Sequence, residues 1–147
     1  MPKTELEGRA AILAAAESWL GTPFHDDARV KGVGVDCAQF VAACFLEAGV
    51  VPAFEIPRYQ AQWFLHHSEE RLQQFVMKFG HEIPESAVKS GDLVLYKLGH
   101  AYAHAAIVVA WPTQIIHAHL LSRMVIKAAP FDTDLRDRDV KFFSLWK

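Results

Sequence analysis

The segment Gly32-Val33-Gly34-Val35-Asp36-Cys37-Ala38-Gln39-Phe40-Val41 passes from a glycine-containing approach into the start of an apolar helix. Asp36 is suited to cap that helix, because its side chain can accept hydrogen bonds from the free N–H groups of the first turn. Gly49 is a typical residue just after a helix end. Between them, small or apolar residues recur at helical spacing, at Cys37, Phe40, Val41, Cys44, Phe45 and Ala48. We therefore predict a helix from about Asp36 to Ala48, with Cys37 at its N-terminal end on the core-facing side.

The position of Cys37 allows two interpretations. Unpaired N–H groups and the helix dipole at a helix start stabilise negative charge, which favours a reactive thiolate. Alternatively, Cys37 is a small buried hydrophobic residue, as many free cysteines are. Cys44 lies about two helical turns away, roughly 10 Å, which is beyond the reach of a disulfide within the helix. We therefore expect no disulfide and no need for an oxidising compartment.

Length and composition limit the class of protein. The 147 residues are enough for one domain with a hydrophobic core, and we predict a single domain over 1–147. The hydrophobic fraction of 52% and the aromatic fraction of 12% are typical of a globular chain. The net charge of −2 provides no bulk attraction to nucleic acid or to an anionic membrane. We expect no nucleic-acid partner.

The most apolar N-terminal stretch, Ala10 to Leu20, contains or follows the acidic residues Glu5, Glu7 and Glu17, which argues against a signal peptide. No segment approaches the ~20 apolar residues that span a bilayer, so we expect no membrane insertion. The sequence thus predicts a protein without an export signal that is cytoplasmic as synthesised.

The first half of the chain predicts helices. One helix begins after Thr4 and ends near Gly21, and residues 24–35 are polar and glycine-rich, which predicts a loop. Residues 58–79 predict a helix in two pieces, the second of which starts at Ser68.

The second half predicts strands and a solvated connector, residues 130–139, which is rich in Asp and Arg. Helices first and strands later indicate an α+β fold, with N-terminal helices packed on a mostly antiparallel sheet of about five strands. The five predicted strands are 92–96, 103–110, 114–119, 124–129 and 140–146.

Histidines on two of these strands are candidate bases for Cys37. A nucleophilic cysteine needs a nearby base that a third group orients. His104 is followed by the small residues Ala105 and Ala106, which let a helix N-terminus approach. If the second and third strands form a hairpin, His104 lies opposite a residue between about 117 and 120, and His117 and His119 share one face. Pairing register alone does not choose between His117 and His119.

The same histidines could instead bind zinc, with His104, His117 and His119 joined by His100 or Cys37. Their spacings match no standard zinc pattern, so we expect no metal and no cofactor. There is also no glycine-rich phosphate loop and no serine in a strand–turn–helix elbow. Of the other histidines, three are expected to have no catalytic role: His66, His67 and His81. The roles of His25 and His100 are undecided.

Six segments, in this order, make the chain similar to a known family. The chain resembles the NlpC family of bacterial cell-wall cysteine peptidases, which are papain-like in fold, and within it the small variants encoded in phages and prophages. Each segment is weak alone, but the ordered set covers nearly the whole chain. The segments are Trp19-Leu20-Gly21-Thr22-Pro23-Phe24, Gly34-Val35-Asp36-Cys37, Pro57-Arg58-Tyr59-Gln60-Ala61-Gln62-Trp63, Gly91-Asp92-Leu93-Val94-Leu95-Tyr96, Ala103-His104-Ala105-Ala106-Ile107 and Ile115-Ile116-His117-Ala118.

The resemblance implies that Cys37 is the nucleophile, that His104 is the general base and acid, and that His117 rather than His119 orients His104. The Cys37 N–H would be one oxyanion donor. Three parts of the sequence depart from the family pattern, which has Ser-Gly-Leu after the cysteine, a tyrosine at 24 and a glycine at 106. These changes imply an altered substrate or reduced activity. The residues expected to support the cleft or the oxyanion site are Asp36, Ala38, Gln39 and Phe24.

The function that the resemblance implies is hydrolysis of peptidoglycan stem peptides, at a γ-D-glutamyl–diamino-acid bond, by a Cys-His-His triad. By analogy with cysteine peptidases, a thiolate–imidazolium pair is expected before substrate arrives. The alternative is a phage tail-assembly or wall-binding component with weak or lost activity. The partners are therefore peptidoglycan stem peptides and, in the alternative, phage tail proteins, with the protein carried by a virion or released at lysis.

Overall fold

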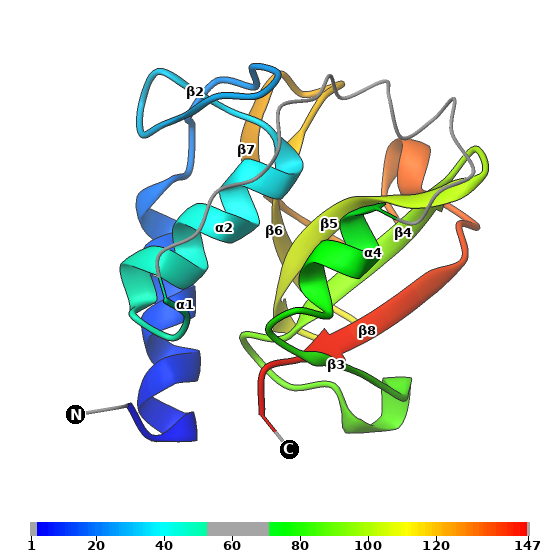
Figure 1. Ribbon diagram of the computed structural model, residues 1–147. Coiled ribbons are helices and arrows are strands. Elements are labelled where there is room, and N and C mark those ends of the chain that lie inside the picture. The colour runs from blue at the N-terminus through cyan, green and yellow to red at the C-terminus, as the bar shows by residue number, and fades with distance from the viewer. Residues whose placement is uncertain (1–2, 53–70, 147) are drawn as a thin grey trace.

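Two N-terminal helices pack against a six-stranded antiparallel sheet in the computed structural model (Figure 1), which describes residues 3–52 and 71–146. Helix α1 spans Glu5–Ser18 and helix α2 spans Cys37–Ala48. Of the helix predicted over 58–79, residues 58–70, which include the start of its second piece at Ser68, lie outside the described residues. The segment 57–63, His66 and His67 lie outside them as well. The expected α+β architecture of helices on a mostly antiparallel sheet is confirmed.

Both helices start at the predicted capping residues. The Thr4 hydroxyl accepts a hydrogen bond from the Glu7 N–H at 3.1 Å, and the Glu7 carboxylate accepts one from the Thr4 N–H at 3.2 Å. This reciprocal pair is a capping box. Asp36 accepts from the Gln39 N–H at 2.9 Å, and Gly49 ends α2 in the left-handed conformation with φ of 70°. Local side-chain chemistry therefore sets the position of Cys37 at the first residue of α2.

The sheet has the strand order β3-β8-β4-β5-β6-β7, and every neighbouring pair is antiparallel. The five predicted strands are all present. The sixth, β3, pairs with β8, and it is too short and too polar to show an alternating pattern in the sequence. His81, just after the end of the helix predicted over 58–79, begins β3. The strands are β3 (His81–Ile83), β4 (Leu93–Leu98), β5 (Ala101–Ala110), β6 (Gln114–His119), β7 (Met124–Ala128) and β8 (Val140–Ser144).

The segment before Cys37 is more ordered than the predicted loop. It contains a small hairpin of β1 (Arg29–Val30) and β2 (Gly34–Val35), which lies beside β7 at one end of the molecule (Figure 1). Phe24 forms a bridge with Val35. Strands of two residues carry no periodic signal, so the sequence pattern could not reveal them. The hairpin fixes the chain immediately before Asp36.

The prediction that residues 130–139 form a purely solvated connector is also wrong. It contains the short 3₁₀ helix η2 (Thr133–Leu135), and Leu135 is only 2% exposed. Leu135 packs into a second core cluster with Val94, Tyr96 and other strand residues. One apolar side chain therefore anchors a loop whose composition is otherwise polar.

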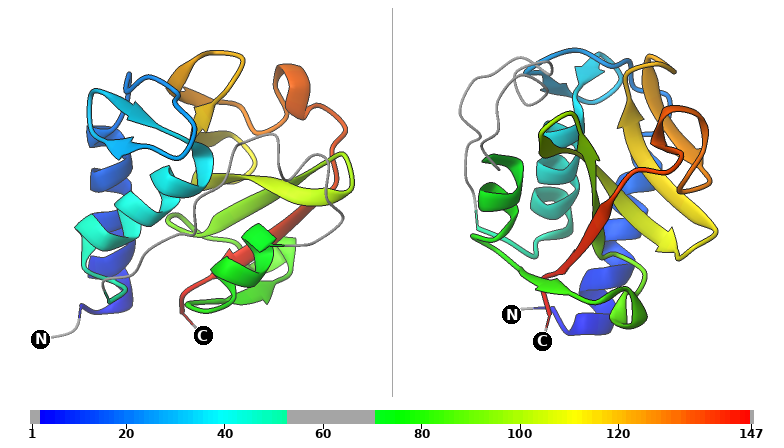
Figure 2. Two further views of the ribbon diagram at one scale, coloured as in Figure 1. Left: turned by 45° about the horizontal axis from the view of Figure 1, so that its top comes forward. Right: turned by 90° about the vertical axis from the view of Figure 1, so that its right-hand side faces the viewer.

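Helix α2 is the buried centre of the fold. It packs on α1 and on strands β5 and β6, and only Leu46 and Glu47 along its length are not buried. Two views of the molecule show α2 and the short helix α4 (Arg71–Val76) beside the strongly twisted sheet (Figure 2). Two short 3₁₀ segments are also present, η1 (Glu85–Ala87) and η2, whose Leu135 packs against strand residues. No helix in the described ranges is long and apolar enough to cross a membrane.

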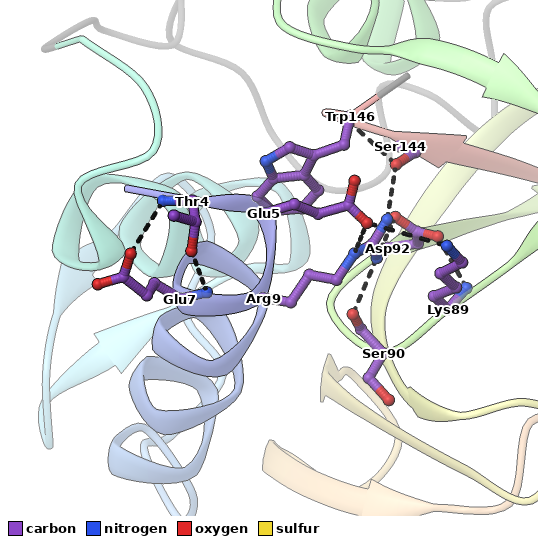
Figure 3. A network of polar contacts seen from close by, with 9 residues as sticks. All are labelled: Thr4, Glu5, Glu7, Arg9, Lys89, Ser90, Asp92, Ser144 and Trp146. Carbon is purple, nitrogen blue, oxygen red and sulfur yellow. Dashed lines mark hydrogen bonds and ion pairs between the residues drawn. The ribbon is translucent and has the colours of Figure 1, made fainter. Parts of the chain in front are cut away.

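A buried ion pair fastens α1 to the sheet (Figure 3). The Arg9 guanidinium donates to Asp92 Oδ1 at 2.8 Å, to the Ser90 carbonyl at 2.9 Å and to Ser144 Oγ at 3.3 Å. It also lies 4.6 Å from the centre of the Trp146 ring. A buried guanidinium needs such a set of acceptors because its desolvation is costly. Arg9 thereby joins the first helix to strands β4 and β8.

Candidate active site

Asp36 fixes the start of α2 and the loop before it. One carboxylate oxygen accepts from the Gln39 N–H, and the other accepts from the Asp27 N–H at 2.7 Å. Asp36 is fully buried and is not among the residues that line the cleft described below. The aspartate beside the cysteine thus acts on local structure and on the charge near the sulfur.

The Cys37 thiol is buried between the start of α2 and strand β5. Its Sγ donates to the Ala103 carbonyl at 3.7 Å, and Cys37 is 8% exposed. Burial, followed by the neighbouring Asp36 carboxylate, raises the pKa of Cys37 to about 12. Backbone N–H groups of Ala105, Ala38 and Cys37 itself act in the opposite direction. The helix start lowers the pKa, as expected, but desolvation is the larger effect.

His104 on β5 and His117 on β6 form a direct contact. His104 Nε2 lies 2.7 Å from His117 Nδ1, and the ring centres are 4.9 Å apart. The β5–β6 register brings the two together diagonally, since Ile107 pairs with Ile116. With the His104 proton on Nε2, that nitrogen donates to His117, and Nδ1 of His104 is then the proton acceptor. The structure thus places His117, and not His119, against His104.

Burial also keeps these two imidazoles neutral. It lowers the pKa of His104 to about 4, with a smaller contribution in the same direction from His119. The pKa of His117 falls to about 2, again mainly because of burial. Together with the raised pKa of Cys37, these shifts favour a neutral thiol and a neutral imidazole at rest. Burial thus opposes the expected resting thiolate–imidazolium pair, which stays a prediction.

A cleft of about 300 Å³ lies beside Cys37 and His104. Of the residues proposed from the sequence, Cys37, His104 and Phe24 line it. His117 is 1% exposed and supports His104 from behind. The cleft-lining residues are Phe24, Cys37, Leu98, Gly99, Ala103, His104, His119, Leu120, Leu121, Asp134 and Arg138.

Ala38 and Gln39 are not brought into this cleft. Ala38 packs in the main core cluster, and Gln39 is buried on the same helical turn. The first turn of α2 therefore contributes the Cys37 side chain to the cleft, whereas any oxyanion support from residue 38 would come from its backbone N–H. The departures from the family pattern at 38 and 39 lie behind the cleft wall.

Sequence reasoning missed the participation of Asp134 in the cleft. The sequence predicts that Asp134 lies in a solvated connector and that His119 is an alternative to His117. The structure joins them, with His119 Nε2 at 2.6 Å from Asp134 Oδ1. The signal that could have identified Asp134 is Leu135, a lone apolar residue that anchors the polar connector.

The remaining histidines among the described residues do not line the cleft. His25 and His100 are exposed, and His81 lies on β3. Within residues 3–52 and 71–146, no group of three or more His, Cys, Asp or Glu side chains has an arrangement that could hold a metal ion. The zinc alternative therefore gains no support from this part of the chain.

The fold and the site together define an α+β domain with a cysteine at a helix start and two coupled histidines on adjacent antiparallel strands. A sequence profile of the NlpC/P60 family matches residues 19–140, and the chain belongs to this family. No curated protein sequence matches the chain.

Solved structures share the fold at low sequence identity. The NlpC/p60 domain of the peptidoglycan hydrolase SagA is 23% identical, with a TM-score of 0.60 over 90% of this chain and 96% of the SagA domain. The peptidoglycan hydrolase RipB from Mycobacterium tuberculosis is 18% identical, with a TM-score of 0.63 over 97% of this chain and 66% of RipB.

A third similar structure, RipD from Mycobacterium tuberculosis, is described as a non-catalytic NlpC/p60 domain protein adapted to a peptidoglycan-binding function. It is 16% identical, with a TM-score of 0.60 over 95% of this chain and 98% of RipD. The fold therefore occurs both in peptidoglycan hydrolases and in a protein without catalysis.

Proposed function

We propose that the protein is a cysteine endopeptidase that hydrolyses peptide stems of peptidoglycan at a γ-D-glutamyl–diamino-acid bond. The observation that carries the proposal is the 2.7 Å contact between His104 Nε2 and His117 Nδ1, made in the wall of the cleft that also holds Cys37 at a helix start. Membership of the NlpC/P60 family and similarity to the hydrolases SagA and RipB support it.

In the proposed reaction, His104 Nδ1 takes the Cys37 proton as the sulfur attacks the carbonyl carbon. The N–H groups of Cys37 and Ala38, which already act on the sulfur, would donate to the oxyanion. Collapse of the tetrahedral species breaks the C–N bond, and His104 passes its proton to the leaving amine. Water then attacks the thioester with His104 as base, which releases the acid and restores the thiol.

The resting contacts indicate when the proton moves. The Cys37 thiol donates to the Ala103 carbonyl, so it must turn toward His104 before attack. A neutral pair carries no preformed charge, and the transfer is therefore coupled to attack rather than completed in advance. His117 supports this step, because its Nδ1 accepts from His104 Nε2 and stabilises the imidazolium as it forms.

The test is release of cleaved stem peptides from purified peptidoglycan, followed by mass spectrometry of the products. Cys37→Ala should abolish release, because the covalent intermediate cannot form. Cys44→Ala is the matched control, since Cys44 is buried in the same helix but away from the cleft, and it should keep activity. Hydrolysis that survives Cys37→Ala would exclude the mechanism.

A second candidate is a peptidoglycan-binding protein with weak or no hydrolysis. The burial of Cys37 and its raised pKa favour this second candidate. RipD, which shares the fold, is described as non-catalytic and adapted to a peptidoglycan-binding function. It predicts that wild type and Cys37→Ala co-sediment equally with intact peptidoglycan and that neither releases stem peptides. Three expectations from the sequence stay predictions. They are an association with phages, phage tail proteins as partners, and cytoplasmic synthesis without an export signal.

A further inference from the structure

His119 and Asp134 form a second polar couple in the wall of the cleft, next to the His104–His117 contact. His119 is 5% exposed and both of its ring nitrogens are engaged. Nδ1 lies 2.7 Å from Ser122 Oγ, and Nε2 lies 2.6 Å from Asp134 Oδ1. A buried imidazole bound at both nitrogens cannot rotate without losing a hydrogen bond. The ring of His119 is therefore fixed in one orientation.

Asp134 is itself held in place by its own loop. The Thr133 hydroxyl donates to the same Asp134 oxygen at 2.9 Å, and the Asp134 carbonyl accepts from Arg138 Nε at 3.0 Å. Thr133 has φ of 50°, which is unfavourable for a β-branched residue and persists only where its surroundings enforce it. Leu135 anchors the next position in the core. The loop thus presents the carboxylate to His119 in a defined position.

The fixed ring of His119 lies against His117. The two ring centres are 4.7 Å apart with an interplanar angle of 27°, so the rings are stacked. His117 is in turn 2.7 Å from His104. Contacts therefore continue from Asp134 through His119 and His117 to His104, which lines the cleft with Cys37.

We propose that His119, held by Asp134, is a positioning residue that keeps His117 Nδ1 directed at His104 Nε2. This inference rests on the proposed function in one respect, namely that His104 and His117 are the catalytic histidines. His119 has no nitrogen left for substrate, and Asp134 Oδ1 already takes two hydrogen bonds. His119 therefore acts through His117 and not by binding the substrate.

The two members of the couple act on the pKa of His104 in opposite directions. After burial, the charge interaction with His119 lowers the pKa of both His104 and His117, whereas Asp134 raises that of His104. Protonation of His117 would remove the acceptor at Nδ1. The charge interaction with His119 thus adds to the burial that lowers the pKa of His117 and leaves its Nδ1 free to accept from His104.

Two substitutions at His119 distinguish the effect of its stacked ring from the effect of its hydrogen bonds. His119→Ala removes the stacked ring and both hydrogen bonds, whereas His119→Phe keeps a flat ring against His117. We expect kcat on a stem peptide to fall in His119→Ala by about 10- to 100-fold, the size typical of groups that orient metal-ligating histidines. KM should stay unchanged, as expected when ground-state binding is not affected. His119→Phe should recover part of the loss.

A spectroscopic measurement makes the test independent of hydrolysis. The proton between His104 Nε2 and His117 Nδ1 is buried in a short contact and should give a downfield proton resonance that is lost in His117→Ala. His119→Ala should broaden or shift this resonance, and His25→Ala, which changes an exposed histidine outside the cleft, should not.

The outcomes distinguish the two proposals. An unchanged resonance in a folded His119→Ala protein would overturn the positioning role, and so would a raised KM with unchanged kcat, which indicates direct substrate contact. If His119→Ala does not fold, the same readings on His119→Phe and Asp134→Asn decide. A wild-type protein that hydrolyses nothing, yet whose resonance responds to His119→Ala, contradicts the proposed function and supports the positioning role.

Discussion

At Cys37, two opposing effects act on one sulfur atom. The first N–H groups of α2 favour the thiolate, whereas burial and the Asp36 carboxylate disfavour it and raise the pKa to about 12. His104, with its pKa lowered to about 4 by burial, is a base rather than a cation in the free protein. These shifts support the proposed mechanism, in which charge separates only during the reaction.

This balance predicts the pH dependence of Cys37 alkylation. A thiol with a raised pKa is mostly protonated at neutral pH, so reaction with iodoacetamide should be slower than that of an ordinary thiol of pKa about 8.5. The rate should rise about tenfold per pH unit through the alkaline range, because thiolate is the reacting species. Mass spectrometry of the Cys37 peptide in a Cys44→Ala background measures it. A rate that is already high and constant between about pH 5 and pH 8 would instead indicate a preformed ion pair.

For single residues, the identity of the candidate catalytic residues could be predicted from the sequence, but their ionisation state could not. A helix start is visible as Asp36-Cys37, and the strand positions of His104 and His117 follow from alternation. Desolvation depends on how many elements cover the sulfur, which no local pattern encodes. The role of Asp134 is also not visible locally, because its contact with His119 depends on how the loop that carries Asp134 folds back onto β6.

At the scale of the element, α2 delivers the cysteine because its first turn is capped and its other faces are covered. The two helices and five strands were predictable, since capping residues and runs of alternating or apolar character leave local signals. The hairpin β1–β2, the edge strand β3 and the 3₁₀ turn η2 were not. Each is three residues or fewer and forms because a neighbouring element supplies hydrogen-bond partners or an apolar pocket.

Two substitutions at Asp36 distinguish its role as a helix cap from the effect of its negative charge. Asp36→Asn keeps a good capping side chain and removes the negative charge, whereas Asp36→Ala removes both. Asp36→Ala should lower the free energy of unfolding by about 1–3 kcal/mol, because the Gln39 N–H loses its acceptor and the Asp27 N–H is left unsatisfied. Asp36→Asn should cost less. Urea denaturation measures both.

The same pair tests the electrostatic role of Asp36. Since the Asp36 carboxylate raises the pKa of Cys37, its neutralisation in Asp36→Asn should lower that pKa and speed alkylation at a given pH. Asp36→Ala is expected to give a smaller or irregular gain if the helix start frays. Alkylation of Asp36→Asn that is no faster than wild type would show that the carboxylate charge does not reach the sulfur.

At the scale of the whole molecule, the site depends on how α1, α2 and the sheet are held together. The apolar core is continuous across these elements, and the Arg9 network is the buried polar link between α1 and the strands β4 and β8. Figure 3 shows the guanidinium between the Asp92 carboxylate and the Trp146 ring. Because α2 packs on α1, this link also bears on the placement of Cys37.

Arg9→Ala should destabilise the fold strongly, because it leaves the Asp92 carboxylate buried with part of its partners removed. Breaking a buried pair by removal of one partner typically costs about 3–5 kcal/mol, and lost packing against Trp146 adds to it. Arg9→Lys keeps a charge but cannot reach three separate acceptors at once, so an intermediate loss is expected. Urea denaturation followed by tryptophan fluorescence measures the series.

Lys31→Ala is the matched control for that series. Lys31 pairs with Glu47 at 3.1 Å, but both side chains are substantially exposed, so its removal should cost no more than about 1 kcal/mol. If Arg9→Ala costs as little as Lys31→Ala, the Arg9–Asp92 pair does not hold α1 to the sheet. If Arg9→Ala is strongly destabilised yet folded at low temperature, its kcat shows whether loosening α1 disturbs the Cys37 end of α2. We expect kcat to fall less than in His119→Ala, because the cap at Asp36 and the β5–β6 register are untouched.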